Sequence, residues 1–168
     1  AAHLRPTSDR VREAIFNLLI NGSYGNPVQG AQVLDLFAGT GALGLEALSR
    51  GAARAHFIER DRAALAALRA NVAAVGLGGR VVAGDVGAFL ARAAGPFDLV
   101  FVDPPYALPR ASVEQVLGEV ARLLAAGGTA VLHRRAGEGL APPPGLEVAD
   151  RRRYGDSEIT RLVKEGAP

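Results

Sequence analysis

The sequence contains no cysteine, no methionine and no tryptophan. The lack of cysteine excludes disulfide bonds, thiolate catalysis and zinc sites built on cysteine. Imidazole groups are scarce as well, because the only histidines are His3, His56 and His133, and their wide spacing matches no metal-ligand pattern. We therefore expect no metal centre in this protein.

Long apolar runs are also missing. No stretch approaches the roughly 20 uninterrupted apolar residues of a membrane-spanning helix, and no signal segment with a charged start and an apolar centre opens the chain. These absences predict a cytoplasmic protein with no membrane partner. A length of 168 residues suits one domain with a substantial core, and we expect a monomer.

Lysine is nearly absent. Lys164 is the sole lysine, so arginine supplies the other basic side chains, while the formal net charge is only +2. Arginine suits phosphate groups and stacked bases, but a genome rich in G and C would produce the same bias. The composition therefore permits a nucleic-acid partner without requiring one.

A glycine turn between a predicted strand and a predicted helix is the central feature of the sequence. Val33–Phe37 has the length and apolar character of a buried strand, and Ala38–Gly41 ends it sharply. From Ala42 to Arg50 apolar residues recur at helical spacing. The free N–H groups at the start of that helix point toward whatever the glycines admit, which predicts a nucleotide or nucleoside site.

Two cofactors compete for this turn. Gly39, Gly41 and Gly44 match the pattern G-x-G-x-x-G, and the acidic Glu59 follows about 20 residues later, as in dinucleotide-binding folds. Asp35, however, lies in the strand just before the glycines. A carboxylate there would repel a pyrophosphate and suit the ammonium group of an amino acid, which favours S-adenosylmethionine over a nicotinamide cofactor.

The alternation of strand and helix continues along the chain and predicts the fold class. Right-handed crossovers give an α/β, doubly wound, mostly parallel, seven-stranded Rossmann-like sheet with a C-terminal antiparallel hairpin. The expected strands are 33–37, 55–59, 80–84, 97–102, 128–133, 146–153 and 157–163, and the expected helices are 9–20, 42–50, 61–75, 86–94 and 112–125.

Carboxylates stand in or just after the four leading strands, at Asp35, Glu59, Asp85 and Asp103. Ligands of open parallel sheets bind outside the carboxyl ends of the strands, so we expect these side chains to converge on one cleft. Glu59 would accept hydrogen bonds from both ribose hydroxyls, Asp85 would accept the adenine amino group, and Val86 would pack on the ring. The alternatives are a surface acid or a partner of Arg60 for Glu59, and a helix N-cap for Asp85.

The loop Asp103-Pro104-Pro105-Tyr106, named the amine loop below, is the most specific signal. Its prolines remove two N–H donors, so the loop presents mainly acceptors: the Asp103 carboxylate and the Pro104 carbonyl. An exocyclic amine of a nucleobase would donate to both and aim its lone pair at the cofactor's methyl group. Tyr106 would stack on a base drawn out of its own stack. The alternative is a proline turn that merely closes the core.

Three stretches carry a family resemblance: LRPTSDRVREAIFN (4–17), LDLFAGTGALGLEALSRG (34–51) and FDLVFVDPPY (97–106). Together they resemble the RsmD family of bacterial 16S ribosomal RNA guanine-N2 methyltransferases. The resemblance implies S-adenosylmethionine as cofactor, a guanine in the assembled or assembling small ribosomal subunit as target, and a segment 1–30 that covers the cleft of the core, 31–168. It implies these cofactor-binding residues: Arg10, Asn17, Asp35, Phe37, Ala38, Gly39, Thr40, Gly41, Glu59, Arg60, Asp85 and Val86.

One departure concerns RNA binding. Members of that family usually carry a basic hairpin ahead of the first stretch, and this sequence begins almost at it, so RNA binding would weaken if those residues are lacking. Arg134, Arg135 and Arg151–Arg153 are then candidate phosphate contacts, with a solvated edge as the alternative.

Three rival functions stay open. An adenine-N6 methyltransferase on DNA or RNA would use the same amine loop. A nicotinamide oxidoreductase is disfavoured by Asp35, and a non-catalytic RNA-binding assembly factor is disfavoured by the intact motifs.

Overall fold

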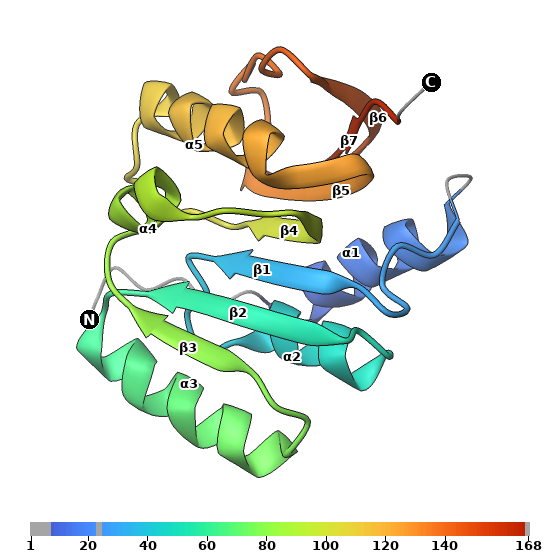
Figure 1. Ribbon diagram of the computed structural model, residues 1–168. Coiled ribbons are helices and arrows are strands. Elements are labelled where there is room, and N and C mark those ends of the chain that lie inside the picture. The colour runs from blue at the N-terminus through green and yellow to red at the C-terminus, as the bar shows by residue number, and fades with distance from the viewer. Residues whose placement is uncertain (1–7, 23–24, 167–168) are drawn as a thin grey trace.

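The computed structural model describes residues 8–22 and 25–166. Over these residues it forms one seven-stranded sheet in the order β3-β2-β1-β4-β5-β7-β6 (Figure 1). The strands are β1 (Gln32–Leu36), β2 (Arg54–Glu59), β3 (Arg80–Ala83), β4 (Phe97–Val102), β5 (Leu124–Arg135), β6 (Leu146–Tyr154) and β7 (Ser157–Lys164). The helices are α1 (Asp9–Asn21), α2 (Ala42–Ser49), α3 (Arg62–Val75), α4 (Val86–Arg92) and α5 (Arg110–Leu123).

The sheet is parallel from β3 to β5 and antiparallel through β7 and β6. The predicted fold class, including the C-terminal antiparallel hairpin, is therefore confirmed. None of the helices in the described ranges is long and apolar enough to cross a membrane.

The sheet is covered on both faces, because successive side chains of a strand point in opposite directions. Val33, Phe57 and Phe101 belong to the core under α1, α2 and α3. Their neighbours Leu34, Ile58 and Val100 belong to the core under α4 and α5. The central strands are apolar on both faces for this reason, which is why they read as continuous apolar runs.

Three helices begin with a side-chain cap. Ser8 accepts a hydrogen bond from the amide of Val11 at the start of α1. Asp61 caps α3 and Asp85 caps α4 in the same way. These caps fix where α3 and α4 leave the carboxyl edge of the sheet.

The boundaries around β5 differ from the prediction. The helix expected at 112–125 begins at Arg110, directly after Pro109, and ends at Leu123, while the strand expected at 128–133 spans Leu124–Arg135. Gly127 and Gly128 lie within this longer strand, which stays beside β4 with an irregularity in the register between Phe97 and Leu99. Two additional residues at the carboxyl end of β5 lie beside the amine loop.

Candidate active site at the carboxyl edge of the sheet

The glycine turn joins β1 to α2 as expected. Gly39 and Gly41 have φ angles of 60° and 91°, a left-handed region that glycine enters at little cost. Gly44 has another role: a Cβ there would overlap the ring of Phe57 and lie 3.0 Å from Asp35 Oδ2. The first two glycines therefore shape the turn, and the third lets α2 pack closely on β2.

Asp35 is buried, with 1% of its surface exposed, and its Oδ2 accepts a hydrogen bond of 2.9 Å from the amide of Gly44. Burial raises the pKa of Asp35 well above its ordinary value, and the charges of Asp103 and Glu59 raise it further, although the Gly44 bond opposes them. In this structure Asp35 joins β1 to the start of α2. A contact with a cofactor ammonium group stays a prediction.

Glu59 ties two loops together at the end of β2. Its Oε1 accepts from the amide of Gly39 at 2.8 Å, and its Oε2 accepts from the amides of Arg60 and Asp61 at 3.0 and 2.8 Å. A carboxylate has about four acceptor positions, so about one of them is left for a ribose hydroxyl. The guanidinium of Arg60 pairs with Asp85, at 3.6 Å, and not with Glu59.

Asp85 shows that both of its predicted roles are compatible with the geometry. Its Oδ2 caps α4 by accepting from the amide of Ala88 at 3.0 Å, so the N-cap is confirmed. Asp85 also lines a cavity of about 540 Å³ with Phe37, Val86 and Leu108. This volume falls within the range of small-molecule sites, about 300–1,000 Å³, and the apolar walls suit a flat ring.

The amine loop follows β4 and lies beside the glycine turn, because Leu36 is the register partner of Val102. Its first residue, Asp103, contacts His133 at the end of β5, with 3.0 Å between Asp103 Oδ1 and His133 Nδ1. Both side chains are almost fully buried, with 7% and 1% exposed. Pro104 is buried and Pro105 is exposed.

Arg134 holds the backbone of the amine loop. Its guanidinium donates to the carbonyls of Pro105 at 2.7 Å and Leu108 at 2.9 Å, and it forms two further bonds with Glu138. The hydrogen bond from Arg134 lowers the pKa of Glu138 below its ordinary value. The prediction that Arg134 contacts phosphate was wrong, because its side chain is buried beneath the loop and its donors are engaged there.

Two contacts hold the side chain of Tyr106, one at its hydroxyl and one on its ring. Its hydroxyl lies 3.3 Å from Ser157 Oγ, and the guanidinium carbon of Arg135 lies 4.8 Å from the centre of its ring. Such stacking of a cation on a ring is favourable by about 0.5–2 kcal/mol. The ring therefore already holds one flat partner, while Arg135 itself is exposed at the edge of the site.

Residues 1–163 match the protein family described as Conserved hypothetical protein 95. The chain belongs to this family of RsmD-type methyltransferases. It is 52% identical over 104 residues to Ribosomal RNA small subunit methyltransferase D of Escherichia coli strain K12, covering 61% of this chain and 50% of that protein. It is 41% identical over 107 residues to Putative rRNA methyltransferase YlbH of Bacillus subtilis, covering 61% and 55%. The matches span about half the length of these relatives.

Solved structures agree with this membership over a greater length. The putative methyltransferase yhhF of Escherichia coli has a TM-score of 0.85 at 36% identity and covers 98% of this chain and 90% of its own. A hypothetical protein of Thermus thermophilus has a TM-score of 0.80 at 38% identity, with the same coverage. The RsmD-type fold thus extends through the C-terminal hairpin, which the shorter sequence matches do not show.

The N-terminal residues predicted for the site make no bond to it among the described residues. Arg10 and Asn17 are exposed on α1, and within residues 8–22 and 25–166 no hydrogen bond or ion pair joins them to the glycine turn or the amine loop. Asn17 instead accepts a bond of 3.4 Å from Asn21. Residues 1–7 and 23–24 of the segment expected to cover the cleft, 1–30, lie outside the described residues, so this role stays a prediction.

The sequence reasoning missed His133 and the true role of Arg134. A lone histidine between apolar and basic residues gave no metal or catalytic pattern. The structure finds it through register: β4 and β5 are parallel neighbours, and the pairing of Val102 with Leu132 places residue 133 beside residue 103. Among the described residues no group of three or more metal-ligating side chains comes together.

Proposed function

We propose that this RsmD-type protein transfers a methyl group from S-adenosylmethionine to the exocyclic N2 amine of a guanine in 16S ribosomal RNA. The observation that carries the proposal is the position of the amine loop directly beside the glycine turn, set by the pairing of Leu36 with Val102. An acceptor pair for an amine and a turn suited to a nucleoside cofactor thus share the carboxyl edge of one sheet.

The residues present fit such a cofactor. Gly39 and Gly41 shape a turn that has no side chain at these two positions to block a ligand, and α2 begins immediately after it. The cavity lined by Phe37, Asp85 and Val86 has room and apolar walls for an adenine ring. When bound, S-adenosylmethionine supplies an electrophilic methyl group on a sulfonium.

The chain's own contribution is to place the amine. The Asp103 carboxylate and the Pro104 carbonyl accept its two hydrogens, which orients the lone pair of the nitrogen and reduces its conjugation with the base. No strong base is needed before transfer, because the methylated nitrogen loses a proton readily. Orientation is the main source of rate in this scheme.

The choice of ribosomal RNA is supported by the relatives. Ribosomal RNA small subunit methyltransferase D of Escherichia coli is named for that substrate, and its match includes more than half of this chain. The choice of guanine N2 is supported by the family resemblance of the amine loop. Adenine N6 is the second candidate, since a loop of two acceptors serves any exocyclic amine.

The test uses methyl-labelled S-adenosylmethionine and three substrates from a host that lacks the enzyme: small ribosomal subunits, deproteinised ribosomal RNA and DNA. The labelled product is digested and its nucleoside identified by mass. We expect N2-methylguanosine from ribosomal material, and none with an Asp103→Ala variant that retains cofactor affinity within a few-fold. Methyladenine, or label only in DNA, would overturn the proposal.

Cofactor identity is tested separately by thermal unfolding. A ligand that binds only the folded protein raises its midpoint by mass action. We expect S-adenosylhomocysteine to raise the midpoint and NAD to leave it unchanged, and we expect Glu59→Ala to weaken the first effect. Stabilisation by NAD alone would reject the assignment of the glycine turn.

A further inference from the structure

Three consecutive residues at the end of β5, His133–Arg134–Arg135, each hold a different part of the amine loop. His133 contacts the Asp103 carboxylate, Arg134 donates to the carbonyls of Pro105 and Leu108, and Arg135 stacks on the Tyr106 ring. We name these residues the β5 bracket. They act on separate groups, because they bind a side-chain carboxylate, the backbone and a ring in turn.

Within the β5 bracket, His133 contacts the Asp103 carboxylate, the side chain proposed to bind the amine. Asp103 is the residue whose oxygens would meet the amine, and a carboxylate at the end of a strand can rotate about two side-chain bonds. The imidazole is 1% exposed and belongs to a strand in the middle of the sheet, between β4 and β7. It therefore gives the Asp103 carboxylate a rigid partner on one oxygen.

We propose that His133 is the positioning residue of the methyl-transfer site, donating from Nδ1 to Asp103 Oδ1 and so fixing the carboxylate that receives the amine. This inference rests on the proposed function for its effect on turnover. The bond from His133 occupies one of about four acceptor positions of the carboxylate, and an amine hydrogen needs one more. The proposal requires a proton on Nδ1 of His133.

The charges around Asp103 give this donor a second effect. Asp35 lies close enough to Asp103 for the charge of Asp103 to raise the pKa of Asp35, so two carboxyl groups share this part of the site. An N–H donor stabilises the ionised carboxylate. His133 thus places a donor against Asp103 Oδ1 in surroundings that also contain the Asp35 carboxyl group.

The rest of the β5 bracket makes this role separable from folding. Arg134 holds the loop backbone through two carbonyls without using Asp103 or His133. Removing the imidazole therefore removes this donor from the carboxylate and leaves the bonds between Arg134 and the loop backbone intact. The prediction is a loss of turnover at nearly unchanged cofactor affinity.

The test compares His133→Leu with His133→Asn. Leucine fills a similar volume without a donor, whereas the asparagine amide can donate from nearly the position of Nδ1. We expect His133→Leu to lower kcat by about 100-fold, with the KM for RNA and the dissociation constant for S-adenosylhomocysteine within a few-fold, since misplacing a reacting group can cost that much. We expect His133→Asn to recover at least about a tenth of the wild-type kcat, because the donor is retained.

The matched control is His56→Leu, because His56 is a histidine of β2 that packs edge-on against Phe97 at 5.7 Å, away from the amine loop. It should leave kcat unchanged. Full turnover by His133→Leu, or equal losses in His133→Leu and His133→Asn, would overturn the positioning role. A wild-type protein that methylates no substrate would instead refute the proposed function.

A second measurement does not depend on activity. The ¹⁵N spectrum of the imidazoles in the wild-type protein reports which ring nitrogen carries the proton, and His133→Asn assigns the signal. We expect the Nδ1–H tautomer at His133, and its perturbation by Asp103→Ala. An Nε2–H tautomer with an unprotonated Nδ1 would overturn the inference even if His133→Leu failed to fold.

Discussion

At the scale of single residues, Asp35 combines burial with a hydrogen bond that a neutral side chain could also accept. Because burial raises the pKa of Asp35, the folded protein holds its proton more readily than the unfolded chain does. The stability associated with this group is fully present below its unfolded pKa and is lost as pH rises through the raised, folded pKa. The buried carboxylate is thus a cost to the fold at neutral pH.

The variant Asp35→Asn tests this cost, because its side-chain oxygen can still accept from Gly44. We expect the wild type to lose free energy of unfolding relative to the variant as pH rises from about 4 to neutrality. Urea denaturation at a series of pH values measures the difference. A difference that stays constant with pH would show that Asp35 does not titrate as its burial implies.

Gly44 is the residue where close packing can be tested most directly. A Cβ there meets the ring of Phe57, which is fully buried and cannot move aside, so we expect Gly44→Ala to lower the free energy of unfolding by about 1–3 kcal/mol. Gly118→Ala in α5 is the matched control, since a Cβ there meets no atom within 4 Å. It should gain about 0.5–1 kcal/mol from helix propensity. Destabilisation by both variants would point to a cause other than the Phe57 contact.

At the scale of elements, the buried Arg134, paired with the partly exposed Glu138, connects the end of β5 to the amine loop. Arg134→Met would leave Glu138 and two carbonyls without a donor, and we expect a loss of about 3 kcal/mol in the free energy of unfolding. The pKa of Glu138, lowered by Arg134, means that this pair stabilises the fold above the unfolded pKa and weakens as pH falls through the folded one. Denaturation near neutral pH measures the main effect.

Arg122 supplies the control for this element. It also bonds to a glutamate and two carbonyls, those of Ala93 and Leu90, but about half of its side chain is exposed. Water can replace those bonds, so Arg122→Met should cost less than about 1 kcal/mol. Equal losses in the two variants would mean that burial is not what makes the Arg134 pair strong.

Order and type of the elements could be predicted because they depend on local patterns. Apolar runs that end in acids and helical spacing after each turn placed β1 to β4 and their helices within one or two residues. β5 was predicted too short, since its first residues contain Gly127 and Gly128 and are held by the neighbouring β4. The direction of Arg134 could not be predicted, because it depends on partners 26 and 29 residues away in sequence.

The same distinction applies to the site. Single residues with strong local chemistry, such as Gly39, Gly41 and the Asp85 cap, were placed correctly from their neighbours. The bond between Glu59 and the amide of Gly39 and the His133 contact arise only when separate loops meet at one edge, so they required the structure. Turns and caps formed within one motif can be predicted from the sequence, whereas contacts between side chains of separate motifs cannot.

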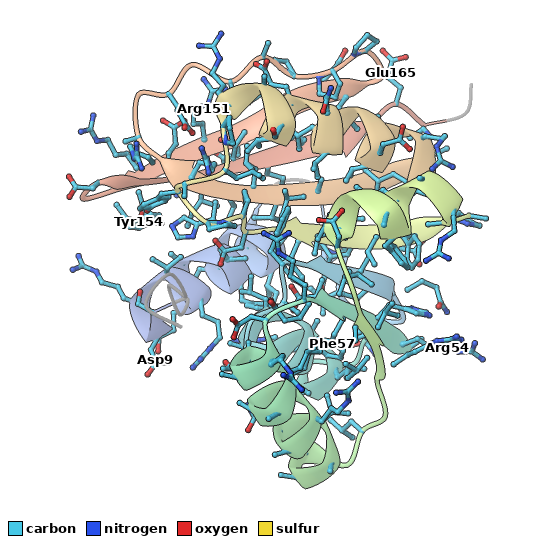
Figure 2. The ribbon with its side chains drawn as sticks, turned by 90° about the vertical axis from the view of Figure 1, so that its left-hand side faces the viewer. Asp9, Arg54, Phe57, Arg151, Tyr154 and Glu165 are labelled. Carbon is cyan, nitrogen blue, oxygen red and sulfur yellow. The ribbon has the colours of Figure 1, made fainter. Side chains whose placement is uncertain are left out.

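At the scale of the whole molecule, exposed arginines lie on the C-terminal hairpin and also on β2, at a distance from the hairpin. Figure 1 shows the arrows of β1, β2 and β3 pointing to one side, and Figure 2 views the molecule from that side, with Arg151 and Tyr154 on the C-terminal hairpin and Arg54 far from both. Arg151, Arg152 and Arg153 are exposed on β6, the last strand of the sheet. Asp150 and Glu158 pair with Arg152 and Arg151, so the hairpin is only partly positive.

This arrangement gives a prediction about RNA that separates phosphate contacts from a solvated edge. If all three arginines of β6 contact phosphates, changing them together to glutamine should reduce the slope of log binding constant against log salt by about 2, at roughly 0.7 per contact on single strands. The matched control changes Arg54, Arg69 and Arg80, three exposed arginines on β2, α3 and β3, and should alter the slope much less. Filter binding of a small-subunit RNA fragment at several salt concentrations measures both. Equal slopes for the two triple variants would identify the arginines of β6 as a solvated edge and leave Arg135, beside Tyr106, as the phosphate candidate nearest the amine loop.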